Sequence, residues 1–175
     1  MPLKWEEKAF VKQVHEVAFE RTRIKEVFKA YFLLEDKRED ILKANGRDYE
    51  AAEARESGRV INDYYETELS PIFPIVSHHV CAYQDGEVFS ALMEFILANP
   101  GSASEELSDI LGEIYICRPD FMIVYANEHQ EYQLIMDHID FGFLNATYND
   151  RDRPEFLVLK ARLDSLNTSR PFRNY

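Results

Sequence analysis

Apolar residues recur at steps of three or four along the first part of the chain, which is the spacing of one face of an α-helix. The positions that follow this spacing are Phe10, Val14, Val17, Ile24, Phe28 and Tyr31. They predict a long amphipathic helix over residues 4–34. Arg21 fills the one gap in the stripe. We expect its guanidinium group to reach solvent at the edge of the stripe, and an ion pair with a carboxylate of another helix is the less favoured alternative.

Helical spacing continues along the chain and is interrupted by residues that end helices. Asn45-Gly46 is expected to stop the first helix, or a short second helix over 36–45. Gly58 is expected to act as a hinge or break, and the two prolines of residues 70–74 end a helical face over 60–69. The other helices are predicted over 47–57, 86–98, 103–117, 128–147 and 154–166.

Three helix starts are predicted from residues that cap helices. Asp85 precedes the helix over 86–98 and can accept a hydrogen bond from its first turn. Ser102 and Glu105 have the spacing of a capping box. Asp152 is expected to cap the last helix, with Pro154 in its first turn.

Two apolar segments cannot be assigned from spacing alone. Residues 75–83 fit either a short buried helix or an extended segment. Residues 121–125 are the best strand candidate, but no second strand of similar quality exists to pair with them, so we predict a helix there. The expected fold is all-α: a compact bundle of six to eight helices, with stacked helix pairs as one arrangement, and a loose tail from about residue 167.

The length and charge of the chain indicate its domain organisation and the kinds of partner that it can bind. Its 175 residues, of which 46% are hydrophobic, can bury a sizeable core as one domain over residues 1–175. The net charge of −12 comes from the middle, because residues 48–150 hold 3 basic and 20 acidic residues. One sign of charge over that length repels nucleic acids and anionic membranes and attracts a basic protein. Alternatively, the surplus only keeps the protein soluble, with the basic ends folding back over the acidic middle.

The sequence also carries information on the compartment. No run of about 18 apolar residues occurs, so no membrane-spanning helix is predicted. The first residues lack the apolar stretch of a secretory signal. We therefore expect a cytoplasmic protein, or a periplasmic or secreted one if a leader was removed, that is a monomer or a homodimer.

Residues 128–140 hold the densest group of histidines and carboxylates, which are the residues that bind catalytic metals. Helical spacing places His129 and His138 on opposite sides of an apolar stripe, so one metal ion cannot bind both. A solvent-exposed helix flank is the default interpretation, and no cofactor is predicted. The alternative is a metal-dependent hydrolase that uses Glu131 and His138 with ligands from another helix.

Sequence motifs for other catalytic chemistry are absent. The chain contains no Glu-x-x-His pair, HExxH, phosphate-binding glycine loop or GxSxG motif. His78-His79 and Cys81 could in principle supply a base and a nucleophile, but near-adjacent residues in one short segment rarely reach the required geometry. The sequence therefore favours a protein that is not an enzyme.

Two groups of residues are candidates for binding a partner. Helical spacing places three acidic residues on one outward face of the helix over 103–117. Tyr64 lies among acidic residues, which is favourable for a protein interface, although the favoured interpretation is that Tyr64 and Tyr65 edge the core. The candidate contact residues are Asp63, Tyr64, Glu66, Glu68, Glu106, Asp109 and Glu113.

These observations lead to a functional hypothesis. We expect a non-enzymatic protein-binding domain whose acidic middle binds a basic partner, as an inhibitor or immunity protein of a toxin or nuclease does. A structural or adaptor subunit, in which stacked helix pairs present a groove, is the second alternative beside the hydrolase. An exposed apolar stripe would favour the adaptor.

Overall fold

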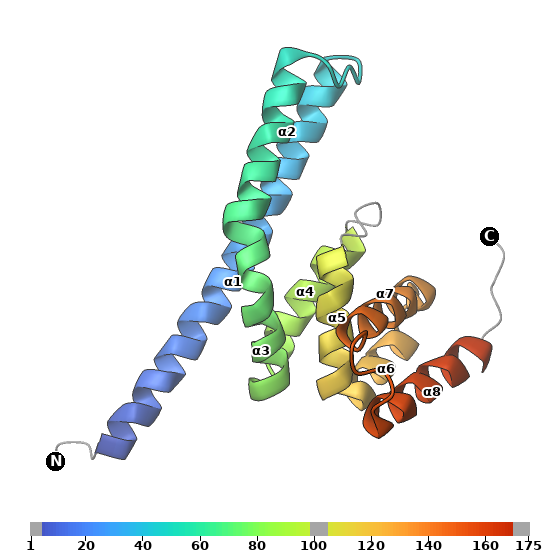
Figure 1. The fold of residues 1–175 in the computed structure, drawn as a ribbon. Coiled ribbons are helices and arrows are strands. Elements are labelled where there is room, and N and C mark those ends of the chain that lie inside the picture. Colours follow the sequence, from blue (N-terminus) through green and yellow to red (C-terminus); the bar gives the residue numbers. More distant parts are fainter. Residues whose placement is uncertain (1–4, 99–104, 170–175) are drawn as a thin grey trace. The chain divides into compact units, whose positions relative to one another are not determined.

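The computed structural model describes residues 5–98 and 105–169, and all the regular structure in these ranges is helical (Figure 1). The all-α prediction is therefore confirmed. The chain divides into two compact units, an N-terminal unit (Met1–Phe95) and a C-terminal unit (Ile96–Tyr175). The α-helices are α1 (Trp5–Ala44), α2 (Ala52–Tyr64), α3 (Phe73–Tyr83), α4 (Gly86–Ala98), α5 (Glu105–Cys117), α6 (Pro119–Glu128), α7 (Tyr132–Ala146) and α8 (Pro154–Ser169).

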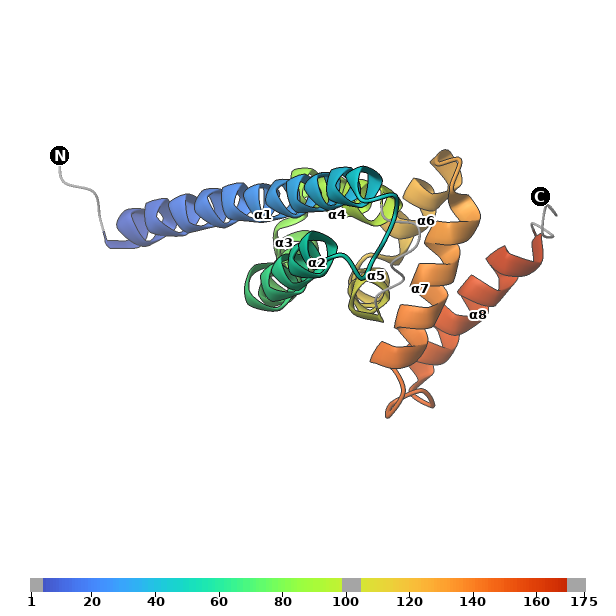
Figure 2. The same ribbon diagram turned by 90° about the horizontal axis from the view of Figure 1, so that it is seen from above.

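Helix α1 is one uninterrupted helix of 40 residues, so the two predicted segments 4–34 and 36–45 are continuous. The apolar stripe buries Ile24 and Phe28, but Val14 is 50% exposed. The first turns of α1 extend beyond the helices that pack on it within this unit (Figures 1 and 2). The chain turns at Gly46 and Arg47, which both have left-handed φ values (62° and 61°), as predicted from the glycine.

The chain returns along α1 as a continuous helical path, where breaks had been predicted. Gly58 lies inside α2 and does not interrupt it, and α2 begins at residue 52 instead of 47. The path continues through a π-helical segment (Tyr65–Leu69) and a 3₁₀ segment (Ser70–Ile72) into α3. Pro71 and Pro74 occupy first-turn positions of successive helical segments, where no N–H donor is needed. The ambiguous residues 75–83 are thus helical.

Aromatic rings form the core of the N-terminal unit. Phe95 of α4 stacks on Phe28 with ring centroids 4.9 Å apart, and Tyr31 and Phe32 pack against the same ring. Tyr65 packs edge-on against Tyr31 at 6.4 Å. The interpretation that Tyr65 edges the core is therefore correct for this residue.

The C-terminal unit is built around a close crossing of α5 and α7. A Cβ atom added to Gly112 would lie 2.1 Å from the carbonyl carbon of Gly142, and one added to Gly142 would lie 1.7 Å from the carbonyl oxygen of Ser108. The two helices therefore touch through their backbones. Helix α8 packs on this pair, because Tyr115 donates a hydrogen bond to the Leu159 carbonyl at 3.0 Å and Leu163 is fully buried.

Several predicted boundaries in this unit are shifted. Residues 121–125 are helical, within α6, as predicted. Helix α7 begins at Tyr132 instead of residue 128, because His129 leaves the helical conformation (ψ 149°) and ends α6. Helix α8 begins at Pro154, as predicted. Arg153, and not the predicted cap Asp152, directly precedes it, and the helix extends to Ser169 instead of residue 166. The Ser102 cap lies outside the described residues. The single-domain prediction for residues 1–175 stays a prediction.

Candidate functional site

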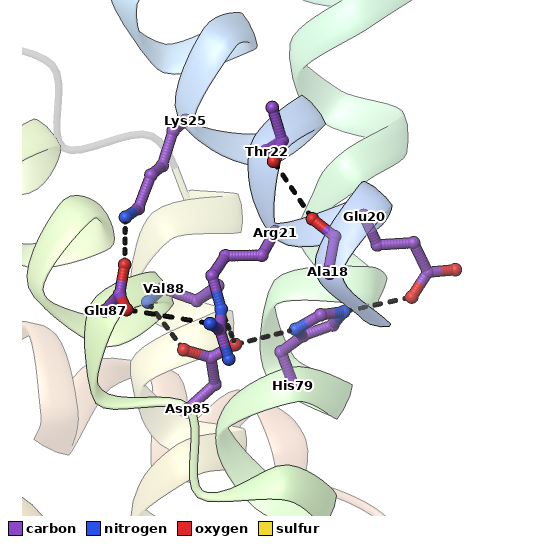
Figure 3. A network of polar contacts seen from close by, with 9 residues as sticks. All are labelled: Ala18, Glu20, Arg21, Thr22, Lys25, His79, Asp85, Glu87 and Val88. Atoms are coloured by element: carbon purple, nitrogen blue, oxygen red, sulfur yellow. Dashed lines mark hydrogen bonds and ion pairs between the residues drawn. The ribbon is translucent and has the colours of Figure 1, made fainter. Parts of the chain in front are cut away.

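A cluster of charged side chains joins α1, α3 and the start of α4 in the N-terminal unit (Figure 3). Asp85 lies directly before α4 and its side chain is only 1% exposed. One carboxylate oxygen accepts a hydrogen bond from the Val88 N–H at 3.2 Å, which confirms the predicted cap. The other oxygen accepts a bond from Nε of Arg21 at 2.7 Å and lies 3.1 Å from Nδ1 of His79. Asp85 thus connects three elements.

His79 is completely buried between two carboxylates. While Nδ1 faces Asp85, Nε2 lies 3.0 Å from a carboxylate oxygen of Glu20 on α1. An ionised carboxylate only accepts hydrogen bonds, so both ring nitrogens can donate only when the ring carries both protons. Both nitrogens of His79 face carboxylates and Cys81 is disulfide-bonded, so the two residues do not form a pair of base and nucleophile.

The contacts of the cluster change the pKa values of Asp85 and Arg21 in opposite directions. Burial alone would raise the pKa of Asp85, but the hydrogen bonds from Arg21, His79 and the Val88 amide outweigh this effect and lower it. The hydrogen bond to Asp85 raises the pKa of Arg21. The side chain of Arg21 is 36% exposed, so it reaches solvent at the edge of the stripe as expected, and it also forms the less favoured ion pair, because the start of α4 brings Asp85 to α1.

A cleft of about 970 Å³ adjoins this cluster. Its walls carry cations from α1 and acidic residues from α4, and Lys25 pairs with Glu87 across it. Ion pairs across the cleft connect α1 with α4. Among the described residues that line it, no serine or tyrosine hydroxyl is hydrogen-bonded to a histidine or carboxylate that could act as its base. The lining residues include Arg21, Lys25, Lys29, Phe28, Phe32, Tyr83 and Glu94.

The predicted contact residues of the N-terminal unit lie at the end of α2 and in the π-helical segment that follows. Asp63 pairs with Arg59 at 2.6 Å, and Glu68 lies 4.0 Å from Arg23 of α1. The hydroxyl of Tyr64 donates a hydrogen bond to the Val27 carbonyl at 3.3 Å, so Tyr64 is half-buried against α1. Glu66 is exposed. Arginines therefore accompany two of these acidic residues.

The predicted contact residues of the C-terminal unit all lie on α5. Glu106 and Glu113 are exposed, as expected for an outward face. Asp109 is half-buried and accepts a hydrogen bond from the side-chain amide of Asn145 on α7 at 2.9 Å. The seven predicted residues are thus divided between the two units.

The basic ends of the chain pair with acidic residues of the middle within each unit. In the N-terminal unit, the cations of α1 contact Asp85, Glu68 and Glu87. In the C-terminal unit, Lys160 of α8 contacts Asp140 at 3.2 Å and Arg162 contacts Asp120. The alternative in which the ends fold back over the middle is therefore realised for these groups. Each unit still has a net charge of −6.

The structure separates the two residues of the alternative metal site. Glu131 is exposed, directly before α7, whereas His138 is buried and its Nδ1 lies 2.8 Å from Oγ of Ser108. Burial lowers the pKa of His138, against the opposing charge of Asp137. The expectation that His138 lies on a solvent-exposed flank is wrong, because the close crossing covers it with α5. Within residues 5–98 and 105–169, no three histidines, cysteines or carboxylates are grouped to bind a metal ion.

Sequence reasoning missed the buried pair formed by Ser108 and His138. Both side chains are less than 10% exposed, and their hydrogen bond links α5 to α7 beside the glycine crossing. Ser108 precedes Gly112 by four positions, and His138 precedes Gly142 by four positions. This equal spacing is the feature of the sequence from which the pair could have been predicted. The pair stabilises the crossing and has no access to substrate.

Comparisons with known proteins add no functional information. No protein-family model matches the chain, and no significant match to a curated protein or a solved structure was found. None of the helices that the structure describes is long and apolar enough to span a bilayer. The function is therefore argued from the charges and surfaces of the two units.

Proposed function

We propose that the chain is a non-enzymatic protein-binding domain that recognises a basic partner protein. In the most specific form of this proposal, it covers a functional surface of that partner, as inhibitors and immunity proteins do. The support comes from charge and exposure, because the two buried histidines, His79 and His138, are held in structural contacts. Negative charge on an exposed helix attracts a basic partner and accelerates its association.

The observation that carries this proposal is the charge that remains on α5. The helix contains no lysine or arginine. Two cations of α8 pair with other helices, since Lys160 and Arg162 contact acidic residues of α7 and α6. Asp109 is held by a neutral amide and not by a cation. Glu113 is exposed and Asp109 lies half-buried beside a neutral amide, so this part of α5 presents negative charge at the surface of the folded unit.

Affinity capture from an extract of the source cells tests this proposal. The immobilised protein is expected to retain a basic protein at low salt and to release it at high salt, because salt screens exposed charges. The double variant Glu106→Lys/Glu113→Lys should lose the captured protein. Asp150→Lys/Asp152→Lys, which changes two exposed acidic residues and the net charge equally, is the control and should retain it. Equal capture by both variants would refute the role of α5.

A structural or adaptor subunit is the second candidate, because exposed apolar residues occur on the first half of α1. Val14 is 50% exposed and Phe19 is 70% exposed. If this segment binds a second chain, light scattering should detect an oligomer that the variant Val14→Ser/Phe19→Ser converts to a monomer. A monomeric wild-type protein would argue against self-association through α1.

A further inference from the structure

The outer face of α7 carries apolar side chains that the C-terminal unit leaves exposed. Phe141 and Leu144 are each 46% exposed, and Tyr148, just after the helix, is 72% exposed. A spacing of three residues places Phe141 and Leu144 on one flank of α7, about 100° and 160° around the axis from Gly142, which faces α5, and Tyr148 follows the end of the helix. This spacing is the one by which a helix binds another amphipathic helix.

Acidic residues border this apolar strip on the side of α5. Asn145 lies on the same flank of α7 and bonds to Asp109, so the strip adjoins the acidic face of α5. Glu113 continues that face beyond Asp109, about 100° around α5 from the crossing glycine. Asp137, on the strip itself, is exposed and accepts a hydrogen bond from the amide of Gln133 at 2.8 Å. The border of the strip toward α5 is thus negatively charged.

Charge complementarity identifies the kind of segment that fits this face. We propose that the strip of Phe141, Leu144 and Tyr148 binds a basic amphipathic helix of the partner protein. The apolar side of that helix would cover the strip, and its lysines or arginines would meet Asp109, Glu113 and Asp137. This inference rests on the proposed function and adds the structural element that is recognised.

The same charges argue against a second copy of this face as the occupant. A two-fold axis perpendicular to the strip would bring the acidic borders of two copies together, and one along the strip would place Asp137 against its own copy. Like charges across an interface oppose association in both cases. A basic helix replaces that repulsion by attraction while burying the same apolar side chains. The strip is therefore assigned to a different chain.

A labelled synthetic peptide tests this inference directly. The probe is an amphipathic helix of leucine and lysine, compared by fluorescence anisotropy with a leucine–glutamate peptide of the same pattern and with a leucine–lysine peptide of scrambled order. We expect the patterned basic peptide to bind most tightly. Phe141→Ser/Leu144→Ser should weaken its binding by at least about tenfold, which is the effect of losing two apolar contacts at the centre of an interface.

The matched control replaces exposed apolar residues on other helices of the same unit. Val124 on α6 is 55% exposed and Val158 on α8 is 69% exposed, and Val124→Ser/Val158→Ser should leave peptide binding unchanged. Circular dichroism and thermal unfolding should show that both double variants fold like the wild type, because all four residues are exposed. Equal weakening by the two variants, or equal binding of the acidic peptide, would overturn the inference.

Two further outcomes separate this inference from the proposed function. If the captured partner is lost on Glu106→Lys/Glu113→Lys but is retained by Phe141→Ser/Leu144→Ser, the basic partner exists and the α7 site is wrong. If the protein forms a dimer that Phe141→Ser/Leu144→Ser dissociates, the occupant is a second copy and the inference is overturned. If the patterned peptide binds as expected but the extract yields no basic protein, the inference on the α7 face is supported and the proposed function fails.

Discussion

At the scale of single residues, the contacts of Asp85 show which polar interactions can be predicted from the sequence. Its bond to Val88 is local, and the position of Asp85 before an apolar helix predicts it. The contacts with Arg21 and His79 join residues that are 64 and 6 positions away in the chain. A periodic pattern shows that Arg21 interrupts an apolar stripe, but it does not show which carboxylate a distant helix brings there. The same limit explains why the Ser108–His138 pair was missed.

Removing the Asp85 side chain is expected to destabilise the protein strongly. Asp85→Ala leaves Arg21, His79 and the first turn of α4 without their acceptor, and we expect it to lower the free energy of unfolding by about 2–4 kcal/mol. Urea unfolding monitored by circular dichroism measures this change. The control Asp63→Ala removes an exposed ion pair and should cost less than about 1 kcal/mol. Similar losses in both variants would contradict the central position of Asp85.

Asp85 also makes stability depend on acidity. Because its pKa is lower in the folded than in the unfolded state, its stabilising effect is fully present above about pH 4 and is lost as the pH falls through the folded-state pKa. The difference in unfolding free energy between the wild type and Asp85→Asn should therefore shrink between about pH 6 and pH 2.5. Unfolding curves at these two pH values measure it, and a difference that stays constant would contradict the lowered pKa.

At the scale of elements, helix faces were predictable and helix boundaries were less so. The buried part of the α1 stripe (Ile24, Phe28 and Tyr31) and the N-cap of α4 follow directly from local spacing. Gly58 and the prolines of residues 70–74 have local tendencies to break a helix, but packing against α1 keeps the path helical and shifts the prolines to first-turn positions. Tertiary packing overrides such tendencies when enough apolar surface is buried.

The same substitution at different glycines should have opposite effects. Gly112→Ala or Gly142→Ala places a Cβ atom against the backbone of the facing helix, and we expect a loss of about 3 kcal/mol or more. Gly58→Ala meets only the Arg38 side chain, at 3.6 Å, and should stabilise α2 by about 0.5–1 kcal/mol. Thermal and urea unfolding of the three variants measures these changes. A neutral Gly142→Ala would show that α5 and α7 do not touch through their backbones.

At the scale of the whole molecule, the distribution of charge along the sequence predicted only part of the distribution of charge in the fold. The count of charges showed an acidic middle and basic ends, and the structure pairs members of these segments within each unit. Which acidic residues keep their charge depends on tertiary contacts, so α5 could not be distinguished from α2 by counting. The exposed strip of α7 was also not predicted, because the sequence does not show which side of an apolar helix remains uncovered.

The most direct test of this account is the association rate of the captured basic partner as a function of salt. Stopped-flow fluorescence would compare the wild-type protein with Glu106→Lys/Glu113→Lys. If charge on α5 attracts the partner, the wild-type rate falls steeply with ionic strength and the variant is slower at low salt, with a flatter dependence. Rates that do not depend on salt, or identical salt dependences of the two proteins, would contradict the account.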